Sequence, residues 1–373
     1  RYEVGQDIAH PDALLLRSHK LQEAEIVDSV TAIARAGAGV NNIPLAACSE
    51  RGIPVFNTPG ANANAVKELV AAAMLLASRD IVGGIAFAQA QDPGMSAQDM
   101  NALMEQEKKR FAGAELAGKT LGVVGLGSIG SLVARQGLNF GMEVVGFDPA
   151  LSVEAAWRLP SEVQRMENVQ SLFSRSDFIS LHLPVLDSTR GLVNEEMLTH
   201  FKKGSCLLNF AREEIVSTEA VVAALDNGQL RCYVADFPSP MLLGRTDTLL
   251  MPHIGASTAE AEENCAIMAA NQLKAFLEHG NIRNSVNFPA IELERTTDYR
   301  ITIANRNEPG MLSHVLTLIG DEGLNVADLL NKSFGDVAYN IIDLDEVPQE
   351  GLLNKIRTVE GVINLRLIEG TPG

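Results

Sequence analysis

A glycine-rich segment lies between two apolar runs and has a clear chemical use. Gly125, Gly127 and Gly130 form the pattern G-x-G-x-x-G, and Asp148 lies 23 residues after the first glycine. The first glycine permits a tight turn, the second lets the backbone approach a pyrophosphate, and the third lets a helix pack closely on a strand. A carboxylate at position 148 can accept hydrogen bonds from both hydroxyls of an adenosine ribose, but it repels a 2′-phosphate. The pattern therefore predicts binding of NAD rather than NADP.

The residues around these glycines predict the elements that hold them. Leu121–Val124 is a short apolar run of the kind found in buried parallel strands. Ser128 and Ile129 begin a segment whose apolar residues recur at helical spacing, and Val144–Phe147 indicates a second strand. The helix N-terminus offers unpaired N–H groups and a positive dipole end to phosphate groups. This strand–turn–helix–strand order favours a dinucleotide site over a glycine-rich turn in some other α/β protein.

Strand and helix patterns continue to alternate after Asp148 and predict a doubly wound parallel sheet. Further strands are expected at Phe178–Leu181, Ser205–Asn209, Arg231–Val234 and Thr248–Met251. The polar residues that follow these strands are His182, Arg212, Asp236 and His253. Because ligands bind at the carboxyl edge of such a sheet, we expect these side chains to gather near the cofactor.

The N-terminal region shows a second, smaller α/β pattern. One predicted strand ends at Arg17 and is followed closely by Lys20, at the strand end where open α/β sheets bind ligands. Another predicted strand ends at Ala36 and leads into a turn that contains Ala38 and Gly39. Backbone N–H groups in such a glycine turn can hold a carboxylate.

The last part of the chain, 299–373, has the predicted order strand–helix–strand–strand–helix–strand, which is that of a ferredoxin-like module. Near its first helix lie Asn305 and Asn307, and Asn325 follows that helix. An asparagine amide offers both a hydrogen-bond donor and an acceptor, and turns and helix caps favour this residue. We expect a substrate-binding domain at 1–79 and 265–294, a Rossmann domain at 80–264 and the ferredoxin-like module at 295–373.

Composition excludes several classes of partner. The chain has 373 residues, enough for two or three domains, with 46% hydrophobic and 21% charged residues. A formal net charge of −17 argues against nucleic acid or an anionic membrane as a partner. The four cysteines are scattered without a C-x-x-C pair, and the sequence has neither a membrane-spanning run nor a secretory signal. We therefore expect a cytoplasmic protein with free thiols and no metal site.

Several motifs together resemble the D-2-hydroxyacid dehydrogenase family. They are LLLRSHKL, ARAGAGVNNI, FNTPGANANAV, GKTLGVVGLGSIG, DFISLHLP, LLNFAR and PHIGAST, and the tail is similar to an ACT domain, a small regulatory module. The resemblance covers nearly the whole chain. It implies a doubly wound Rossmann sheet, a discontinuous flavodoxin-like substrate domain, a ferredoxin-like ACT domain, and a homodimer or homotetramer. Most members begin with a strand and a helix ahead of the first motif, so we expect the N-terminal domain to lack them here.

The resemblance also implies roles for individual residues. Arg212 holds the substrate carboxylate and polarises the C2 carbonyl with its planar fork, and His253 takes the C2 hydroxyl proton as hydride passes to the nicotinamide. Asp236 binds the nicotinamide carboxamide. The other implied cofactor contacts are Gly125, Gly127, Ser128, Ile129, Gly130, Asp148, His182, Pro184, Phe210, Ala211 and Gly255. The implied substrate contacts are Arg17, Lys20, Ala38 and Gly39, and the implied contacts to an effector, expected to be L-serine, are Asn305, Asn307 and Asn325.

Two positions depart from the family pattern. The family pairs its histidine with a glutamate five residues after the aspartate, and that position here is Met241. A carboxylate beside an imidazole raises the imidazole pKa and fixes its tautomer, and a methionine does neither. Glu213 directly follows Arg212, where the family usually has glycine. We therefore expect weaker activity or a more acidic pH optimum.

Three functions are compatible with this sequence. The motifs favour oxidation of a phosphorylated three-carbon D-2-hydroxy acid, with feedback through the tail. A second possibility is a dehydrogenase for another D-2-hydroxy acid, such as 2-hydroxyglutarate or glycerate. The third is a catalytically weakened protein that binds NAD and serine as a sensor, with Met241 as the mark of lost catalysis.

Overall fold

The computed structural model describes residues 2–370, apart from the side chain of Glu154. The chain divides into two compact units, Arg1–Ala61 with Glu262–Gly373, and Asn62–Ala261. The second division falls within helix α10 (Ala259–His279), so this helix begins in one unit and ends in the other.

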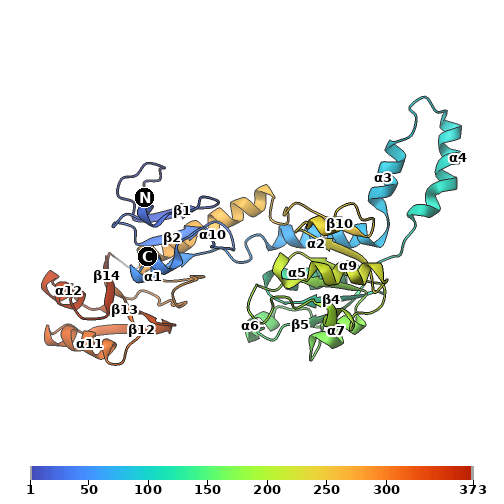
Figure 1. The fold of residues 1–373 in the computed structure, drawn as a ribbon. Coiled ribbons are helices and arrows are strands. Elements are labelled where there is room, and N and C mark those ends of the chain that lie inside the picture. The colour runs from blue at the N-terminus through green and yellow to red at the C-terminus, as the bar shows by residue number, and fades with distance from the viewer. Residues whose placement is uncertain (1, 371–373) are drawn as a thin grey trace. The chain divides into compact units, whose positions relative to one another are not determined.

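The unit of residues 62–261 is built on a parallel seven-stranded sheet in the order β10-β9-β8-β7-β4-β5-β6 (Figure 1). Its strands are β4 (Thr120–Val124), β5 (Glu143–Phe147), β6 (Gln164–Arg165), β7 (Phe178–Leu181), β8 (Ser205–Asn209), β9 (Leu230–Ala235) and β10 (Thr248–Leu250). Every residue of β7 and β8 is buried, as expected for central strands covered on both faces. The prediction of a doubly wound parallel sheet is confirmed.

Helices cover both faces of this sheet. They are α2 (Ala63–Ser78), α5 (Ser128–Asn139), α6 (Val153–Ala156), α7 (Val169–Arg175), α8 (Glu195–Leu198) and α9 (Thr218–Asp226), with 3-10 turns η3 (Glu213–Ile215) and η4 (Pro240–Leu242). One core contains Leu172 and Val221, and the other contains Met74 and Val133. Met74 belongs to α2, which the expected boundary at residue 79 assigns to the other domain. The unit begins instead at Asn62, because the apolar face of α2 completes the cover of the sheet.

An arm of two helices extends from this unit (Figure 1). It consists of α3 (Ile81–Gln89) and α4 (Ala97–Glu107), followed by the 3-10 turn η2 (Lys108–Phe111). Val82 and Ile85 of α3 are more than half exposed. Within residues 2–370, no single helix has the length and apolar character to cross a membrane, although α2 and α3 together pass that test across a 72° bend.

The other unit combines two sheets. A parallel sheet in the order β1-β2-β3 contains β1 (Ala13–Leu16), β2 (Ala32–Arg35) and β3 (Val55–Phe56), with η1 (Glu23–Glu25) and α1 (Leu45–Glu50) nearby in the chain. An antiparallel sheet in the order β12-β13-β11-β14 contains β11 (Tyr299–Arg306), β12 (Val326–Phe334), β13 (Val337–Leu344) and β14 (Val362–Glu369). Helices α11 (Met311–Asp321) and α12 (Glu350–Arg357) complete the βαββαβ order, which confirms the ferredoxin-like prediction.

The antiparallel sheet is fastened to the C-terminal end of α10. The last carbonyl groups of a helix lack partners within the helix, and here side chains of the sheet supply donors. The donor–acceptor pairs are Arg366 to Phe276 and Leu277, Arg300 to His279, and Tyr339 to Gly280. We expected segments 265–294 and 295–373 to belong to different domains. The structure places both in one compact unit.

Candidate active site

In the glycine turn after β4, two positions have no room for a side chain and accept only glycine. Gly125 has a φ of 90°, and a Cβ atom there would lie 2.4 Å from the carbonyl oxygen of His182. A Cβ atom at Gly130 would lie 1.8 Å from the carbonyl oxygen of Gly125. A Cβ atom at Gly127, by contrast, would meet open space. The first and third glycines therefore serve packing, and the second leaves room beside the backbone.

The carboxylate of Asp148, directly after β5, accepts a hydrogen bond from the backbone of the same turn. One carboxylate oxygen accepts the N–H of Leu126 at 2.8 Å, and the other accepts the N–H of Ala150 at 2.9 Å. A carboxylate has about four acceptor positions, so ribose hydroxyls can still bind this one. Asp148 therefore shapes the glycine turn, and its contact to the ribose hydroxyls remains a prediction.

The turn fits the pyrophosphate of a dinucleotide. Helix α5 begins at Ser128, and among the described residues no side chain caps its first N–H groups. His182, after β7, packs its carbonyl against Gly125. Its Nε2 lies 2.8 Å from the Ser180 hydroxyl, while its buried Nδ1 has no hydrogen-bond partner within residues 2–370. Burial lowers the pKa of His182 to about 3, so the ring is neutral and its Nδ1 is free for a ligand.

Arg212 is presented by the turn that ends β8. The buried amide of Asn209 donates to the carbonyl of Arg212 at 2.9 Å and accepts the N–H of Ala211 at 3.2 Å. Phe210 and Ala211 are buried, whereas the Arg212 side chain is exposed and donates to the Ala211 carbonyl at 2.6 Å. Asn209 is a positioning residue that the sequence analysis missed. Its signal was a polar side chain at the end of the apolar run LLN.

The loop of His253 is anchored by Asp236. His253 has a φ of 58°, a left-handed conformation that is uncommon outside glycine. The carboxylate of Asp236 is buried and accepts the N–H groups of Ile254 at 2.8 Å and Gly255 at 2.7 Å. Asp236 therefore fixes the backbone that carries the histidine, a role beyond the expected contact to nicotinamide.

An aromatic ring packs beside the histidine. The ring centroids of Phe237 and His253 are 4.9 Å apart, with the planes tilted by 56°. Met241 lies in η4 with half of its surface exposed, and no ion pair joins His253 to a carboxylate in the part of the chain that the structure describes. Phe237 was also missed by the sequence analysis, because nothing in the motif DFPSPM marks it as a neighbour of position 253.

Sheet topology brings these residues to one edge. Strand β9, which ends just before Asp236, lies between β8 and β10. Because all three strands are parallel, the loops that carry Arg212 and His253 leave the same edge, about 10 Å apart at two strand spacings. Pro184 is exposed at the same edge after β7, and its carbonyl accepts the Thr189 hydroxyl at 2.6 Å.

The expected substrate residues lie on loops of the other unit. The Arg17 guanidinium pairs with the carboxylate of Glu262 at 2.8 Å, and both side chains are about half exposed. Lys20 is exposed. The turn with Ala38 and Gly39 is braced through its carbonyl groups, which accept hydrogen bonds from the side chains of Asn57 and Arg35, respectively.

The expected effector residues make internal hydrogen bonds. Asn305 is buried in the antiparallel sheet, where its amide bonds to Asn340 at 2.7 Å and to the carbonyl of Arg306. Asn325 donates to the carboxylate of Asp345 at 2.6 Å. Asn307 donates to the carbonyl of Gly335 at 3.2 Å. No group of three or more His, Cys, Asp or Glu side chains suited to a metal ion occurs among the residues described.

Comparisons with known proteins agree with this geometry. The model of the D-isomer specific 2-hydroxyacid dehydrogenase, NAD binding domain, matches residues 72–255. A D-3-phosphoglycerate dehydrogenase of Haemophilus influenzae is 30% identical over 98% of this chain and 88% of its own. A hydroxypyruvate reductase of Thermotoga maritima is 37% identical over 71% of this chain and 84% of its own. The NAD-bound 3-phosphoglycerate dehydrogenase of Entamoeba histolytica has a TM-score of 0.57 at 28% identity, covering 75% of this chain and 83% of that one.

The chain therefore belongs to the D-2-hydroxyacid dehydrogenase family. It is an NAD-dependent dehydrogenase, and the donors and acceptors of the glycine turn, Asp148 and His182 fit this cofactor.

Replacement of Gly127 by alanine separates folding from cofactor binding. Because the new methyl group meets only open space in the protein, we expect an unchanged melting temperature. The same methyl group occupies the space needed by pyrophosphate, so the dissociation constant of NAD should rise about tenfold or more, the loss of one or two hydrogen bonds. Isothermal titration of NAD measures this. Gly320→Ala, which also meets open space but lies in α11, is the matched control, and equal NAD affinity of the two variants would contradict the assignment.

Proposed function

We propose that this protein oxidises 3-phospho-D-glycerate to 3-phosphohydroxypyruvate with NAD, the first step of L-serine biosynthesis. The observation that carries the proposal is the similarity to D-3-phosphoglycerate dehydrogenases over 98% of the chain, which includes the C-terminal antiparallel sheet. Relatives of the same name from Methanocaldococcus jannaschii and Escherichia coli extend over 92% and 96% of the chain.

The proposed chemistry divides the work among the residues of the sheet edge. Arg212 binds the substrate carboxylate and polarises the C2 oxygen through two parallel N–H donors. His253 accepts the proton of the C2 hydroxyl, and Asp236 and Phe237 keep its ring in place. Bound NAD supplies the acceptor for the C2 hydride. Asp236 retains acceptor positions for the nicotinamide carboxamide, while Phe210, Ala211 and Gly255 form the backbone beside it.

The proposal assigns the substrate phosphate to Arg17 and Lys20, and the substrate carboxylate also to the N–H groups of the turn at Ala38 and Gly39. Support comes from their place after β1 and β2, at the carboxyl ends of parallel strands. The Arg17–Glu262 pair is exposed, and exposed pairs contribute little, so a phosphate dianion can compete for the guanidinium.

Arg17→Ala tests the phosphate assignment. We expect KM for 3-phosphoglycerate to rise about 10- to 100-fold, because a charge-assisted hydrogen bond contributes about 1.5–3 kcal/mol. The rate with D-glycerate, which lacks the phosphate, should not change. NADH formation from a panel of D-2-hydroxy acids measures both, and Lys109→Ala on the exposed η2 turn is the control. Equal losses of activity with both substrates would contradict the assignment of the substrate phosphate to Arg17.

A second candidate function is reduction or oxidation of an unphosphorylated D-2-hydroxy acid. The 37% identity to the hydroxypyruvate reductase of Thermotoga maritima over 71% of this chain favours it, since that identity exceeds the 34% to a D-3-phosphoglycerate dehydrogenase of Synechocystis over 78% of this chain. The same panel of substrates separates the two, because this candidate predicts a higher kcat/KM for glycerate or 2-hydroxyglutarate than for 3-phosphoglycerate. Absence of NADH formation with every acid would favour the sensor function instead.

The proposal includes L-serine as an effector of the antiparallel sheet and assembly into a homodimer or homotetramer. Asn307 and Asn325 are exposed and lie directly after β11 and directly before β12. Exposed apolar residues of α3, Val82 and Ile85, offer a surface for a second chain. Initial rates with added L-serine, and with L-alanine as control, test the effector. Light scattering of the purified protein gives the number of chains.

Met241→Glu tests the departure from the family pattern. A carboxylate beside an imidazole raises the imidazole pKa and fixes its tautomer, so the acidic limb of the oxidation rate should move to higher pH while the plateau kcat rises about tenfold. Met241→Gln, which has nearly the same size and no charge, should leave the limb in place. Profiles of kcat against pH for the three proteins measure the effect. No gain with glutamate would argue that this enzyme has no need of a histidine–carboxylate pair.

A further inference from the structure

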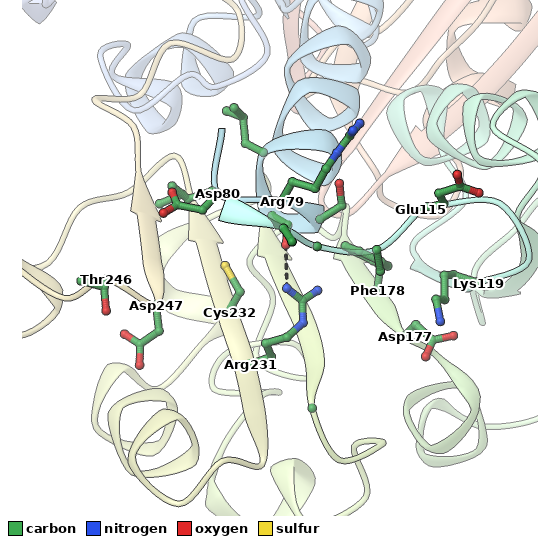
Figure 2. Close-up of a pocket in the computed structure, with 18 residues that line it drawn as sticks. Arg79, Asp80, Glu115, Lys119, Asp177, Phe178, Arg231, Cys232, Thr246 and Asp247 are labelled. Carbon is green, nitrogen blue, oxygen red and sulfur yellow. Dashed lines mark hydrogen bonds between the residues drawn. The ribbon is translucent and has the colours of Figure 1, made fainter. Parts of the chain in front are cut away.

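A cavity of about 460 Å³ lies at the amino-terminal edge of the seven-stranded sheet, the edge opposite to Arg212 and His253. Its lining includes Phe178, Arg231 and Cys232, which stand near the beginnings of β7 and β9, and residues from the end of α2 (Figure 2). None of the residues assigned above to cofactor, substrate or effector lines it. The cavity therefore serves neither the cofactor nor the reaction at C2.

Two cysteines stand side by side at this cavity. Cys206 of β8 and Cys232 of β9 are direct partners in the register of the parallel strands. Neighbouring strands lie about 4.8 Å apart, which falls within the range of Cα separations of about 4.4–6.8 Å that a disulfide can bridge. Both thiols are free and within hydrogen-bonding reach of each other. Only Cys232 lines the cavity, while Cys206 is completely buried behind it.

A guanidinium group is directed at the pair. Arg231 precedes Cys232, and its Nη2 donates to the sulfur of Cys206 at 2.8 Å. Its Nη1 donates to the Ala77 carbonyl at 2.7 Å, which is the dashed line at Arg231 in Figure 2. The two nearby cavity carboxylates are already bound to other partners, Asp177 to Lys202 and Asp247 to Arg245. Arg231 is therefore the charged side chain that contacts the pair directly, while Asp177 and Asp247 oppose its effect from further away.

Electrostatics distinguish the two sulfurs. A hydrogen bond from the Cys206 thiol lowers the pKa of Cys232, and the charge of Arg231 lowers it further, while burial and the carboxylate of Asp247 act in the opposite direction without cancelling these effects. The same hydrogen bond and burial raise the pKa of Cys206. The first proton therefore leaves Cys232, the sulfur that a molecule in the cavity can reach.

We propose that Cys232 and Cys206 form a redox-active pair, in which a small hydroperoxide that enters the cavity is the oxidant and Cys206 is the resolving thiol. The Cys232 thiolate attacks the peroxide, the O–O bond breaks, and a sulfenic acid forms as hydroxide or alkoxide leaves. The sulfur of Cys206 then attacks the sulfenic sulfur, and the disulfide forms as water leaves. One peroxide is reduced by two electrons, and two thiols are oxidised to one disulfide.

The other two cysteines of the chain serve as internal controls for this pair. Cys48 and Cys265 are also buried, but they lie on other elements, and the lining of this cavity includes neither. Burial raises the pKa of Cys48 to about 11, which keeps its thiol protonated and slow to react. The same oxidant should therefore leave Cys48 intact, and it should leave Cys265 intact because this thiol is buried away from the cavity and from the other cysteine pair.

The test is mild oxidation of the full native chain with hydrogen peroxide at neutral pH. We expect the wild type to lose two of its four thiols, with an intact mass lower by two hydrogens and full recovery with dithiothreitol. Peptide mapping without reductant should join Cys206 to Cys232. A disulfide mapped to any other pair, or retention of all thiols, would overturn the proposal, and this result needs no variant to fold.

Variants assign the two roles. Cys206→Ser should accumulate a sulfenic acid at Cys232 that dimedone traps, Cys232→Ser should keep its remaining thiols, and Cys48→Ser should behave as the wild type. Arg231→Gln should slow the oxidation about tenfold, since it removes the charge that favours the thiolate. Oxidation of Cys232→Ser at the wild-type rate would assign the reactive sulfur elsewhere. NAD binding by each variant confirms that it is folded.

Discussion

Replacement of Arg212 by glutamine is expected to lower kcat/KM for the D-2-hydroxy acid about 1000-fold, or about 4 kcal/mol of transition-state stabilisation. The side chain is exposed at the end of β8, on a turn that the buried Asn209 amide holds through two hydrogen bonds. Because the guanidinium bonds to nothing but its neighbour's carbonyl within residues 2–370, its loss should leave the fold intact. NAD affinity and the melting temperature should therefore stay near the wild-type values.

Arg212→Lys sharpens this experiment. Lysine keeps the charge but lacks the planar fork that binds a carboxylate with two parallel hydrogen bonds, so we expect it to recover only a small part of the loss. Glu213→Gln, one residue further along the same turn, is the matched control and should raise activity slightly or leave it unchanged. Steady-state kinetics together with NAD titration measure these effects. A glutamine variant with wild-type kcat/KM would show that another residue holds the substrate.

Local patterns were enough to predict the main features of the sheet and its edge. The glycine turn, the strand before it and Asp148 follow each other within a short stretch, and each is specified by backbone geometry that only a few residue types satisfy. The positions of Arg212 and His253 follow from topology, because parallel strands end at one edge. These features depend on residues that are close in sequence, or on the fact that parallel strands of one sheet end at the same edge.

The features that sequence reasoning missed depend on side chains that meet only after folding. The amide of Asn209 and the ring of Phe237 contact Arg212 and His253 in ways that no motif encodes. Helix α2 was assigned to the wrong unit, because its apolar face fits either side of a domain boundary until its packing partner Val133 is known. The attachment of the antiparallel sheet to α10 likewise joins Arg366 to the carbonyl groups of Phe276 and Leu277, which are 90 and 89 residues away in sequence.

Replacement of Arg300 by methionine is expected to destabilise the unit that contains the antiparallel sheet by about 3–5 kcal/mol, because it leaves a buried charge without a partner. Arg300 and Asp343 are fully buried, with N–O distances of 2.5 and 2.8 Å between their forked groups. The remaining guanidinium donors bind the carbonyl groups of His279, Leu293 and Glu294. One side chain thus neutralises a buried carboxylate, ends helix α10 and fixes the segment that leads into β11.

A double-mutant cycle separates these contributions. Asp343→Leu combined with Arg300→Met removes both charges and should recover part of the loss, but the freed carbonyl groups still cost about 1–3 kcal/mol each when buried. Urea unfolding followed by far-ultraviolet circular dichroism measures the transition of this unit. Lys355→Met, which breaks the exposed pair with Glu322, is the control and should have little effect. A single Arg300→Met variant as stable as the wild type would mean that the sheet is held to α10 by Arg366 and Tyr339 alone, and the double variant would then be no more stable than the single one.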